Sequence, residues 1–172
     1  MSMTHYMELL AQNQPWNLIL FMAIPVILAE TVAITELFIL FSRKFDGPLR
    51  SVNRSASIAG GLYFCGVFIY LMLTAVIPLT INGGWRGAAD VIAVGFYLSG
   101  IVPLLGIALL DMGLIGKTRS QEGKLKLHAS FVALFLVVAH IAMIFGMLDP
   151  ALLMSDAPSA MPGMEAMPGM KH

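Results

Sequence analysis

Four long apolar segments alternate with short polar loops along this chain. The segments cover residues 16–41, 56–81, 88–116 and 127–149. Each exceeds the roughly 20 residues that an α-helix needs to cross a bilayer. Because lipid offers no hydrogen bonds, backbone groups must pair within each segment, and the pattern predicts an all-α, integral membrane four-helix bundle. We therefore expect a transmembrane domain over 16–149, an N-terminal segment over 1–15 and a tail over 150–172.

Prolines and small residues interrupt the apolar segments at positions that affect packing. Pro25, Pro78 and Pro103 lie inside or near the ends of predicted helices, where proline removes a backbone donor and produces a kink. Small residues also recur at four-residue spacing, which lets helices approach closely in lipid. These pairs are Ala56 with Gly60, Gly61 with Cys65, and Gly95 with Ser99. The spacing does not distinguish contacts within one bundle from contacts between two copies.

Basic residues are distributed unequally between the two sides of the predicted bundle. Two loops, 42–55 and 116–128, share eight of the ten Lys and Arg residues. These are Arg43, Lys44, Arg50, Arg54, Lys117, Arg119, Lys124 and Lys126, against Arg86 and Lys171 on the other side. Cytoplasmic loops carry the basic excess in membrane proteins. We therefore predict a multi-pass protein of a bacterial cytoplasmic membrane with both termini extracytoplasmic.

The composition is typical of a membrane protein and excludes other classes. Of 172 residues, 58% are hydrophobic and 12% are charged, whereas soluble domains carry about 25% charged residues. The formal net charge is zero, which gives no basis for nucleic-acid binding. Cys65 is the single cysteine, so no intrachain disulfide can form. Residues 1–15 lack the basic region of a cleavable signal peptide.

Methionine concentrates on the predicted outer side, where twelve of the thirteen methionines lie. Met112 is the exception. The tail contains the pentapeptide Ala-Met-Pro-Gly-Met twice, at 160–164 and 166–170, and it ends in histidine. Thioether sulfur and imidazole nitrogen are ligands that suit Cu(I). The candidate ligands in the two flanking segments are Met3, His5, Met7, Met161, Met164, Met167, Met170 and His172.

The fourth apolar segment adds soft ligands within the membrane. His140, Met143 and Met147 are spaced i, i+3 and i+7, which places them on one stripe of a helix. We expect Cu(I) to pass from the tail and the N-terminal segment to these three residues. Met22 and Met72 are further candidate ligands. Zinc and iron fit poorly, because both prefer thiolate, imidazole or carboxylate ligands to thioethers.

Two other interpretations of the methionine-rich tail stay open. In the first, the tail is a low-complexity segment without a ligand, although such segments favour Ser, Glu, Lys and Gln over Met. In the second, its methionines consume oxidants by cycling through the sulfoxide.

Two ionisable residues lie deep in the predicted helices. Glu30 is near the middle of the first helix, and His140 is about 12 Å from the outer end of the fourth. The two side chains meet if these helices are adjacent. Their contact would then be either a structural hydrogen bond or part of a proton or metal site.

Three further ionisable residues lie near the predicted inner surface. Glu36, Asp111 and His128 occupy similar depths on three different helices. They form an inner exit site or a proton relay, or their carboxylates pair with Arg43 and Lys117 in the adjacent loops. Asp90, at the start of the third helix, is expected to act as a helix cap or dipole partner.

No motif for catalysis or nucleotide binding occurs in the sequence. Walker motifs, glycine-rich nucleotide loops and Cys-x-x-Cys are absent, and neither the serines nor Cys65 has a matching His and carboxylate set. His128 and His140 are roughly 18 Å apart on one helix, so one chain cannot supply the two facing histidines of a b-type haem. We therefore predict that the protein is not an enzyme.

Segments 13–36, 83–98 and 128–150 together resemble a family of small four-helix bacterial membrane proteins, which are loosely labelled permeases or left without a function. The resemblance covers about residues 5–150 and implies a membrane fold without an established chemistry. The tail is similar in composition to the methionine-rich ectodomains of copper importers and to periplasmic copper chaperones.

Together these patterns predict a membrane protein that handles copper by binding Cu(I) on its outer face for transport or delivery. One rival is a proton-coupled permease for small solutes that uses Glu30, Glu36, Asp111 and His140. A second rival is an accessory or assembly subunit of a larger membrane complex. The expected partners are the lipid bilayer, a periplasmic or membrane copper protein and, in a homo-oligomer, a second copy of the chain.

Overall fold

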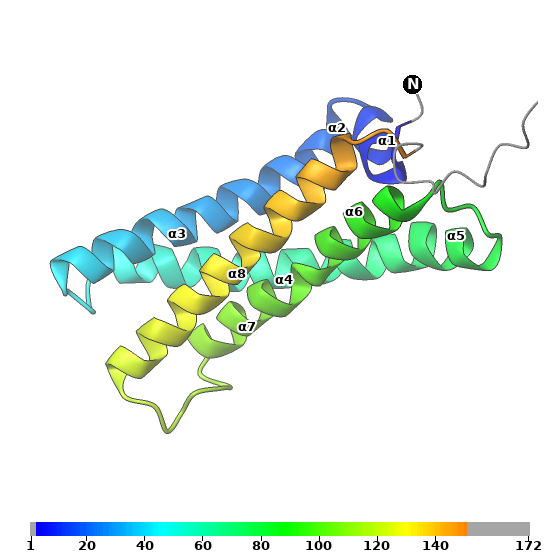
Figure 1. The fold of residues 1–172 in the computed structure, drawn as a ribbon. Coiled ribbons are helices and arrows are strands. Elements are labelled where there is room, and N and C mark those ends of the chain that lie inside the picture. The colour runs from blue at the N-terminus through cyan, green and yellow to red at the C-terminus, as the bar shows by residue number, and fades with distance from the viewer. Residues whose placement is uncertain (1–2, 151–172) are drawn as a thin grey trace, which may run out of the picture.

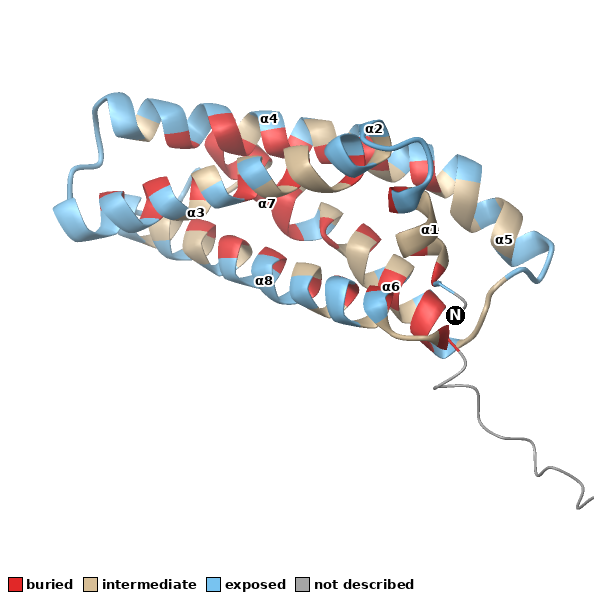
Figure 2. Cartoon of the chain, turned by 90° about the horizontal axis from the view of Figure 1, so that it is seen from above, coloured by how far each residue is buried: buried red, intermediate tan, exposed pale blue. Residues whose placement is uncertain are grey.

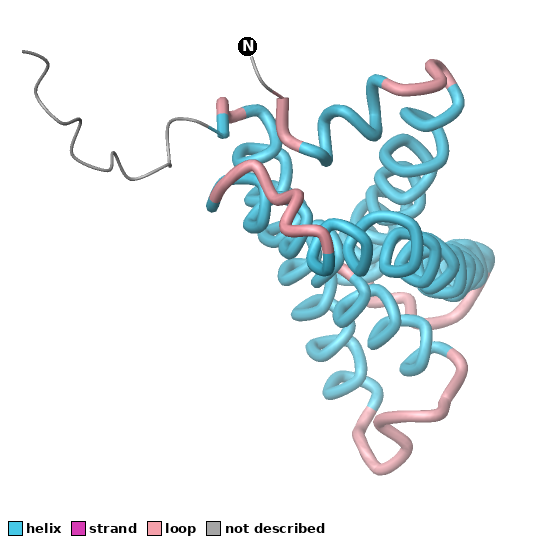
Figure 3. The backbone as a smooth tube through the Cα atoms, turned by 90° about the vertical axis from the view of Figure 1, so that its right-hand side faces the viewer, coloured by secondary structure: helices cyan, strands magenta, loops and turns pink. Residues whose placement is uncertain are grey.

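The computed structural model describes residues 3–150, which form a bundle of antiparallel helices (Figure 1). Four helical spans within this range are long and apolar enough to cross a membrane. They are Trp16–Ser42, Pro48–Ile81, Ala88–Asp111 and Gln121–Met147. The described residues contain helices and connecting loops but no strand (Figure 3). The chain is thus a multi-pass membrane protein by the length and composition of its helices.

Short irregularities divide three of the spans into separately labelled helices. The first contains α2 (Trp16–Leu18), η1 (Ile19–Ala23) and α3 (Ile24–Ser42), and the second contains α4 (Pro48–Leu71), η2 (Met72–Val76) and α5 (Ile77–Ile81). The third contains α6 (Ala88–Ser99) and α7 (Ile101–Asp111), and the fourth is α8 (Gln121–Met147). A short helix, α1 (His5–Ala11), precedes the spans. The elements η1 and η2 are π-helical turns.

The two ends of the bundle differ in what they carry. One end, which we call the terminal end, contains α1, residue 150 and the loop 82–87. A hydrogen bond joins the two ends of the described chain there, because Thr4 Oγ1 donates to the Gly146 carbonyl at 2.6 Å. The other end, called the basic end, holds the loops 43–47 and 112–120. The loops of the basic end contain the cations Arg43, Lys44, Lys117 and Arg119.

The helices at the basic end extend beyond the expected apolar segments. Helix α4 begins at Pro48 rather than near residue 56, because Gly47 takes a positive φ of 117° and Pro48 presets the first helical turn. Helix α8 begins at Gln121 rather than near residue 127, and its N-cap Ser120 accepts a 3.1 Å hydrogen bond from the Gly123 amide. These extensions bring polar residues into the helices.

The backbone before Pro25 lacks a helical donor and receives hydrogen bonds from neighbouring helices instead. Proline has no N–H, so neither the Leu20 nor the Phe21 carbonyl can accept a bond from position 25. The Tyr63 hydroxyl donates to the Leu20 carbonyl at 2.9 Å, and the Tyr97 hydroxyl donates to the Phe21 carbonyl at 2.5 Å. Two tyrosines from α4 and α6 thereby replace the bonds that lipid cannot supply.

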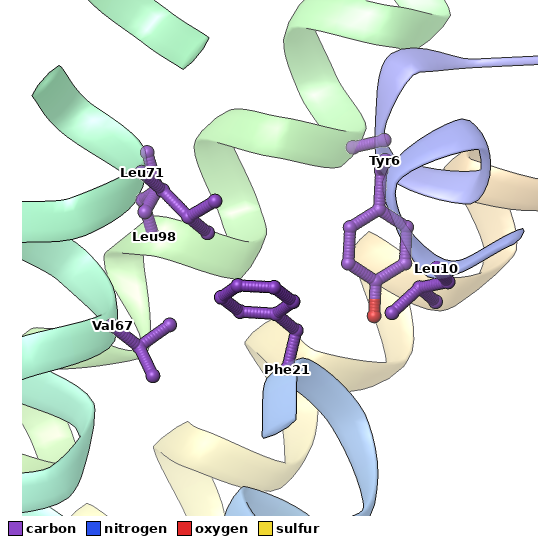
Figure 4. Packing of buried hydrophobic residues seen from close by; sticks show 7 residues of the cluster. Tyr6, Leu10, Phe21, Val67, Leu71 and Leu98 are labelled. Atoms are coloured by element: carbon purple, nitrogen blue, oxygen red, sulfur yellow. The ribbon is translucent and has the colours of Figure 1, made fainter. Parts of the chain in front are cut away.

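Buried residues lie mainly on the inward faces of the helices, as the colours of Figure 2 show. Many large apolar residues are exposed on the bundle surface. The middle of the core contains Phe64, Leu104 and Phe135 from α4, α7 and α8. At the terminal end, the Phe21 ring lies between side chains of α1 and side chains of α4 and α6 (Figure 4). Outward residues such as Phe41, which is 81% exposed, would contact lipid.

Gly61 sets the closest approach between α4 and α7. A Cβ atom at this position would lie 2.5 Å from Ala108 Cβ and 2.7 Å from the Leu104 carbonyl oxygen. The predicted small-residue spacing thus marks an intramolecular contact here. Gly60 contacts Leu28 of α3 at an ordinary distance, and Gly95 has open space around it. The expected close approach at Gly95 therefore does not occur within one chain.

Replacing Gly61 by alanine is expected to destabilise the bundle by about 1–3 kcal/mol, because the added methyl group must push α4 away from α7. Gly66→Ala is the matched control, since Gly66 lies on the same helix with no atom near its missing Cβ. Thermal unfolding in detergent, followed by circular dichroism, should show a lower melting temperature for Gly61→Ala alone. Equal melting temperatures would contradict the close contact.

Candidate functional site

Polar residues from all four spans form a buried cluster near the basic end. We call this the basic-end cluster, and it comprises Glu36, Arg50, Asn53, Ser57, Asp111 and His128. The side chains of Glu36, Asp111 and His128 are 3%, 1% and 2% exposed. Burying two carboxylates and an imidazole costs several kcal/mol per charge, so the contacts among them decide whether this end is stable.

His128 lies between two carboxylates. Its Nδ1 atom is 2.9 Å from Glu36 Oε2, and its Nε2 atom is 3.1 Å from Asp111 Oδ2. The contact with Glu36 is close, but it lacks the alignment of a hydrogen bond. As a result, Glu36 Oε1 and His128 Nδ1 have no hydrogen-bond partner among residues 3–150.

Asp111 is the best-paired member of the basic-end cluster. Arg50 Nη2 donates to its Oδ1 atom at 2.5 Å, and the Ser57 hydroxyl donates to its Oδ2 atom. Arg50 Nη1 also donates to Asn53 Oδ1 at 2.8 Å. The expected loop cations Arg43 and Lys117 therefore do not serve as the charge partners. Arg50 takes that place because α4 begins early and includes it.

A small cavity connects the basic-end cluster with the loops beyond it. Its volume is about 40 Å³, and its lining includes Arg50, Gln121, Lys124 and His128. On the other side of the cluster, towards the terminal end, the interior is apolar and is filled by Val32, Ala56, Ile107 and Val132. The cluster is thus approached from the basic end.

Helices α3 and α8 run antiparallel and meet at Glu36 and His128. Counted along both helices from this contact, Glu30 lies level with about residue 134, which is about 9 Å from the level of His140.

Glu30 and His140 do not meet within one chain. Both are exposed on the outer surface of the bundle. The only hydrogen bond of the His140 ring among the described residues joins Nδ1 to the Leu136 carbonyl at 2.6 Å. Met143 and Met147 share the exposed stripe of α8 and are 38% and 63% exposed. His140 and Met147 of the predicted stripe face outward, whereas Met143 also lines an internal cavity.

At the terminal end, a buried carboxylate holds a histidine of α1. Asp90 is fully buried, and its Oδ2 atom lies 2.5 Å from His5 Nδ1. Asp90 also accepts from the His5 and Arg86 backbone amides at 2.6 and 3.2 Å. Asp90 lies in the first turn of α6, where a negative charge is favourable, but the N-cap position belongs to Gly87.

The second ring nitrogen of His5 is left available. His5 Nε2 has no hydrogen bond to any residue in the range 3–150, and the side chain lines an open pocket of about 380 Å³. Glu8, Gln12 and Thr74 contribute to the same lining. Glu8 also forms a salt bridge with Arg86 of the loop 82–87, and 2.5 Å separates Glu8 Oε2 from Arg86 Nη2. The terminal end therefore presents an oriented imidazole nitrogen beside a solvent-accessible space.

The other predicted ligands of this end do not converge on His5. Met3 is exposed and its carbonyl accepts from Arg86 Nη1 at 2.5 Å, whereas Met7 packs against the apolar residues of Figure 4. His5 and Met7 are two positions apart on a helix, about 200° around its axis. Burial raises the pKa of the neighbouring Tyr6 phenol to about 12, so this oxygen is not an anionic ligand at neutral pH.

Two predicted soft ligands share one internal cavity. Met22 and Met143 both line an apolar space of about 50 Å³ between α3 and α8. No group of three or more His, Cys, Asp or Glu residues with metal-binding geometry occurs in the part of the chain that the structure describes. The tail ligands Met161, Met164, Met167, Met170 and His172 lie outside the described residues.

Sequence reasoning missed Arg50, Asn53 and Ser57 as members of the basic-end cluster. They are spaced i, i+3 and i+7, which puts them on one helix face, and this spacing was a usable signal. The hydropathy pattern hides this helix face, because Arg50 and Asn53 precede the apolar segment 56–81 and the pattern assigns them to a loop.

Replacing Arg50 by glutamine should lower the free energy of unfolding by about 2 kcal/mol, because the buried Asp111 carboxylate loses its guanidinium partner. The double variant Arg50→Gln/Asp111→Asn should lose less than the sum of the two single variants, since it removes both charges. Arg43→Gln, in the adjacent loop, is the control. Equal losses for Arg43→Gln and Arg50→Gln would show that the ion pair does not stabilise the bundle.

Comparison with known proteins places the chain in a family but assigns no activity. The model of one family matches residues 1–162, which is most of the chain. Neither a curated protein nor a solved structure matches it. The chain therefore belongs to DUF6803, a family of unknown function.

Proposed function

We propose that this protein binds Cu(I) at its terminal end and that this end faces the outside of a bacterial cytoplasmic membrane. The observation that carries the proposal is the His5–Asp90 pair. A buried carboxylate fixes one ring nitrogen, and the other nitrogen is free beside an open pocket. Histidines that bind metals commonly have this carboxylate partner, which fixes the tautomer and raises the basicity of the ligating nitrogen.

Soft ligands are concentrated on the same side of the chain. Met3 lies two residues before His5 and is 49% exposed. Pro150, the last described residue before the methionine-rich tail, also belongs to the terminal end. Thioethers with one or two imidazoles match the ligand preference of Cu(I), whereas a zinc site would need more nitrogen, thiolate or carboxylate ligands. The proposed capture site therefore combines His5 with methionines of the N-terminal segment and the tail.

A second group of ligands supports movement of the ion along the fourth span. His140, Met143 and Met147 form an exposed stripe on the half of α8 nearer the terminal end. Because His140 and Met147 face away from the bundle interior, the stripe suits transfer to another protein in the membrane better than passage through this chain. We propose delivery to a membrane or periplasmic copper protein as the function of this stripe.

Cu(I) affinity should fall by about 10–100-fold when His5 is replaced by asparagine. The asparagine amide retains a donor for Asp90 but lacks the second ring nitrogen, so the folded structure is kept. Competition with a chromogenic chelator on the full chain in detergent measures the affinity. Gln12→Ala, which alters the same pocket without removing a soft ligand, should leave the affinity unchanged.

Further variants distinguish capture by the tail from capture by His5. A chain that ends at Leu153 should bind Cu(I) more weakly than the full chain, because it lacks the repeated methionines. His140→Ala should retain capture and lose transfer to a partner. Wild-type affinity in both His5→Asn and the shortened chain would contradict the proposed function.

A further inference from the structure

The net charge of the basic-end cluster is zero only when the cluster binds one proton. Two carboxylates, Glu36 and Asp111, face one guanidinium, Arg50, and one imidazole, His128. With a neutral imidazole the cluster has a net charge of −1, and with a protonated imidazole its net charge is zero. An uncompensated charge in a buried site is costly, so binding one proton removes a large electrostatic penalty.

The geometry places that proton on His128. Each ring nitrogen lies close to a different carboxylate oxygen, at 2.9 Å to Glu36 and 3.1 Å to Asp111. A neutral imidazole has one N–H donor and could satisfy only one of these oxygens, whereas the protonated ring has a donor on each side. Asp111 also receives bonds from Arg50 and Ser57, whereas Glu36 receives one long bond, from Asn53 at 3.4 Å, so Glu36 depends more strongly on the imidazole.

Two polar atoms of the cluster, Glu36 Oε1 and His128 Nδ1, remain available to an exchanging proton or water among the described residues. Glu36 is 97% buried by side chain, yet its Oε1 atom has no hydrogen-bond partner within residues 3–150. A cavity lined by His128, Arg50, Gln121 and Lys124 separates the cluster from the loops of the basic end. The opposite side is closed by apolar side chains of the bundle interior.

We infer that Glu36, His128 and Asp111 form a proton-binding site that opens towards the basic end. One proton enters from water in the cavity, binds the free ring nitrogen of His128 and leaves by the same route. An O–H bond of hydronium breaks as the N–H bond of His128 forms and a water molecule is released, and the reverse occurs when the proton leaves. This site is independent of the proposed copper site, since the two lie at opposite ends of the bundle and share no residue.

The charged groups that face His128 come from every neighbouring helix. Helix α3 contributes Glu36, α4 contributes Arg50, and α7 contributes Asp111. Lys124 of α8 lines the cavity but forms no ion pair with either carboxylate among the described residues, so it is not part of the charge count. His140, on the same helix, is the internal comparison. Its ring contacts one carbonyl and no carboxylate among the described residues.

Nitrogen-15 NMR of the histidine side chains in lipid nanodiscs tests the inference directly. At pH 7, the full-length protein should show a histidine with protons on both ring nitrogens, assigned to His128 by its loss in His128→Gln. In the isosteric Glu36→Gln variant this signal should become that of a neutral ring with one N–H. The His140 signal should be the same in both proteins, and a neutral His128 in the wild-type protein would overturn the inference.

Exchange with deuterated water tests the route of access. Gln121→Trp, which fills the mouth of the cavity, should slow exchange of the His128 ring protons at least tenfold. Gln121→Ala, which widens the same mouth, should leave exchange unchanged or faster. Equal exchange rates in the two variants would overturn access through this cavity. Neither measurement uses copper, so its outcome is separate from that of the proposed function.

Discussion

The need to satisfy every polar group inside the bundle explains much of this structure. Lipid supplies no hydrogen bonds, so a free carbonyl or a lone charge must find a partner in the protein. The turn before Pro25 shows this on the backbone, where the Tyr63 and Tyr97 hydroxyls donate to the Leu20 and Phe21 carbonyls. The basic-end cluster shows it for side chains, because Asp111 accepts from residues of two other helices.

The polar groups gather at the two ends of the bundle and leave an apolar middle. His5 and Asp90 are held at the terminal end, and Glu36 and His128 near the basic end. Between them the interior is filled by side chains such as Phe64. This separation explains why two different chemistries are proposed for the ends, a soft metal at one and a proton at the other. It also means that movement between the ends would require the helices to rearrange.

The hydropathy pattern predicted the four helices and the shared depth of Glu36, Asp111 and His128, because depth follows from counting residues along each span. It did not predict which way each helix turns. Helices in lipid are apolar on all sides, so the pattern does not mark the inward face. For this reason the pattern left the contact between Glu30 and His140 open, and the structure does not contain it, since both side chains face outward. Arg50 was missed because the apolar pattern ends before the helix does.

The proposed capture of copper depends most on which side of the membrane the terminal end faces. Site-directed labelling in a Cys65→Ala background measures this, with Asn82→Cys in the loop of the terminal end and Lys117→Cys in a loop of the basic end. In intact spheroplasts, a membrane-impermeant maleimide should label the cysteine at position 82, and the cysteine at position 117 should react only after permeabilisation. The reverse pattern would place His5 and the methionine-rich tail in the cytoplasm and would contradict copper capture from outside.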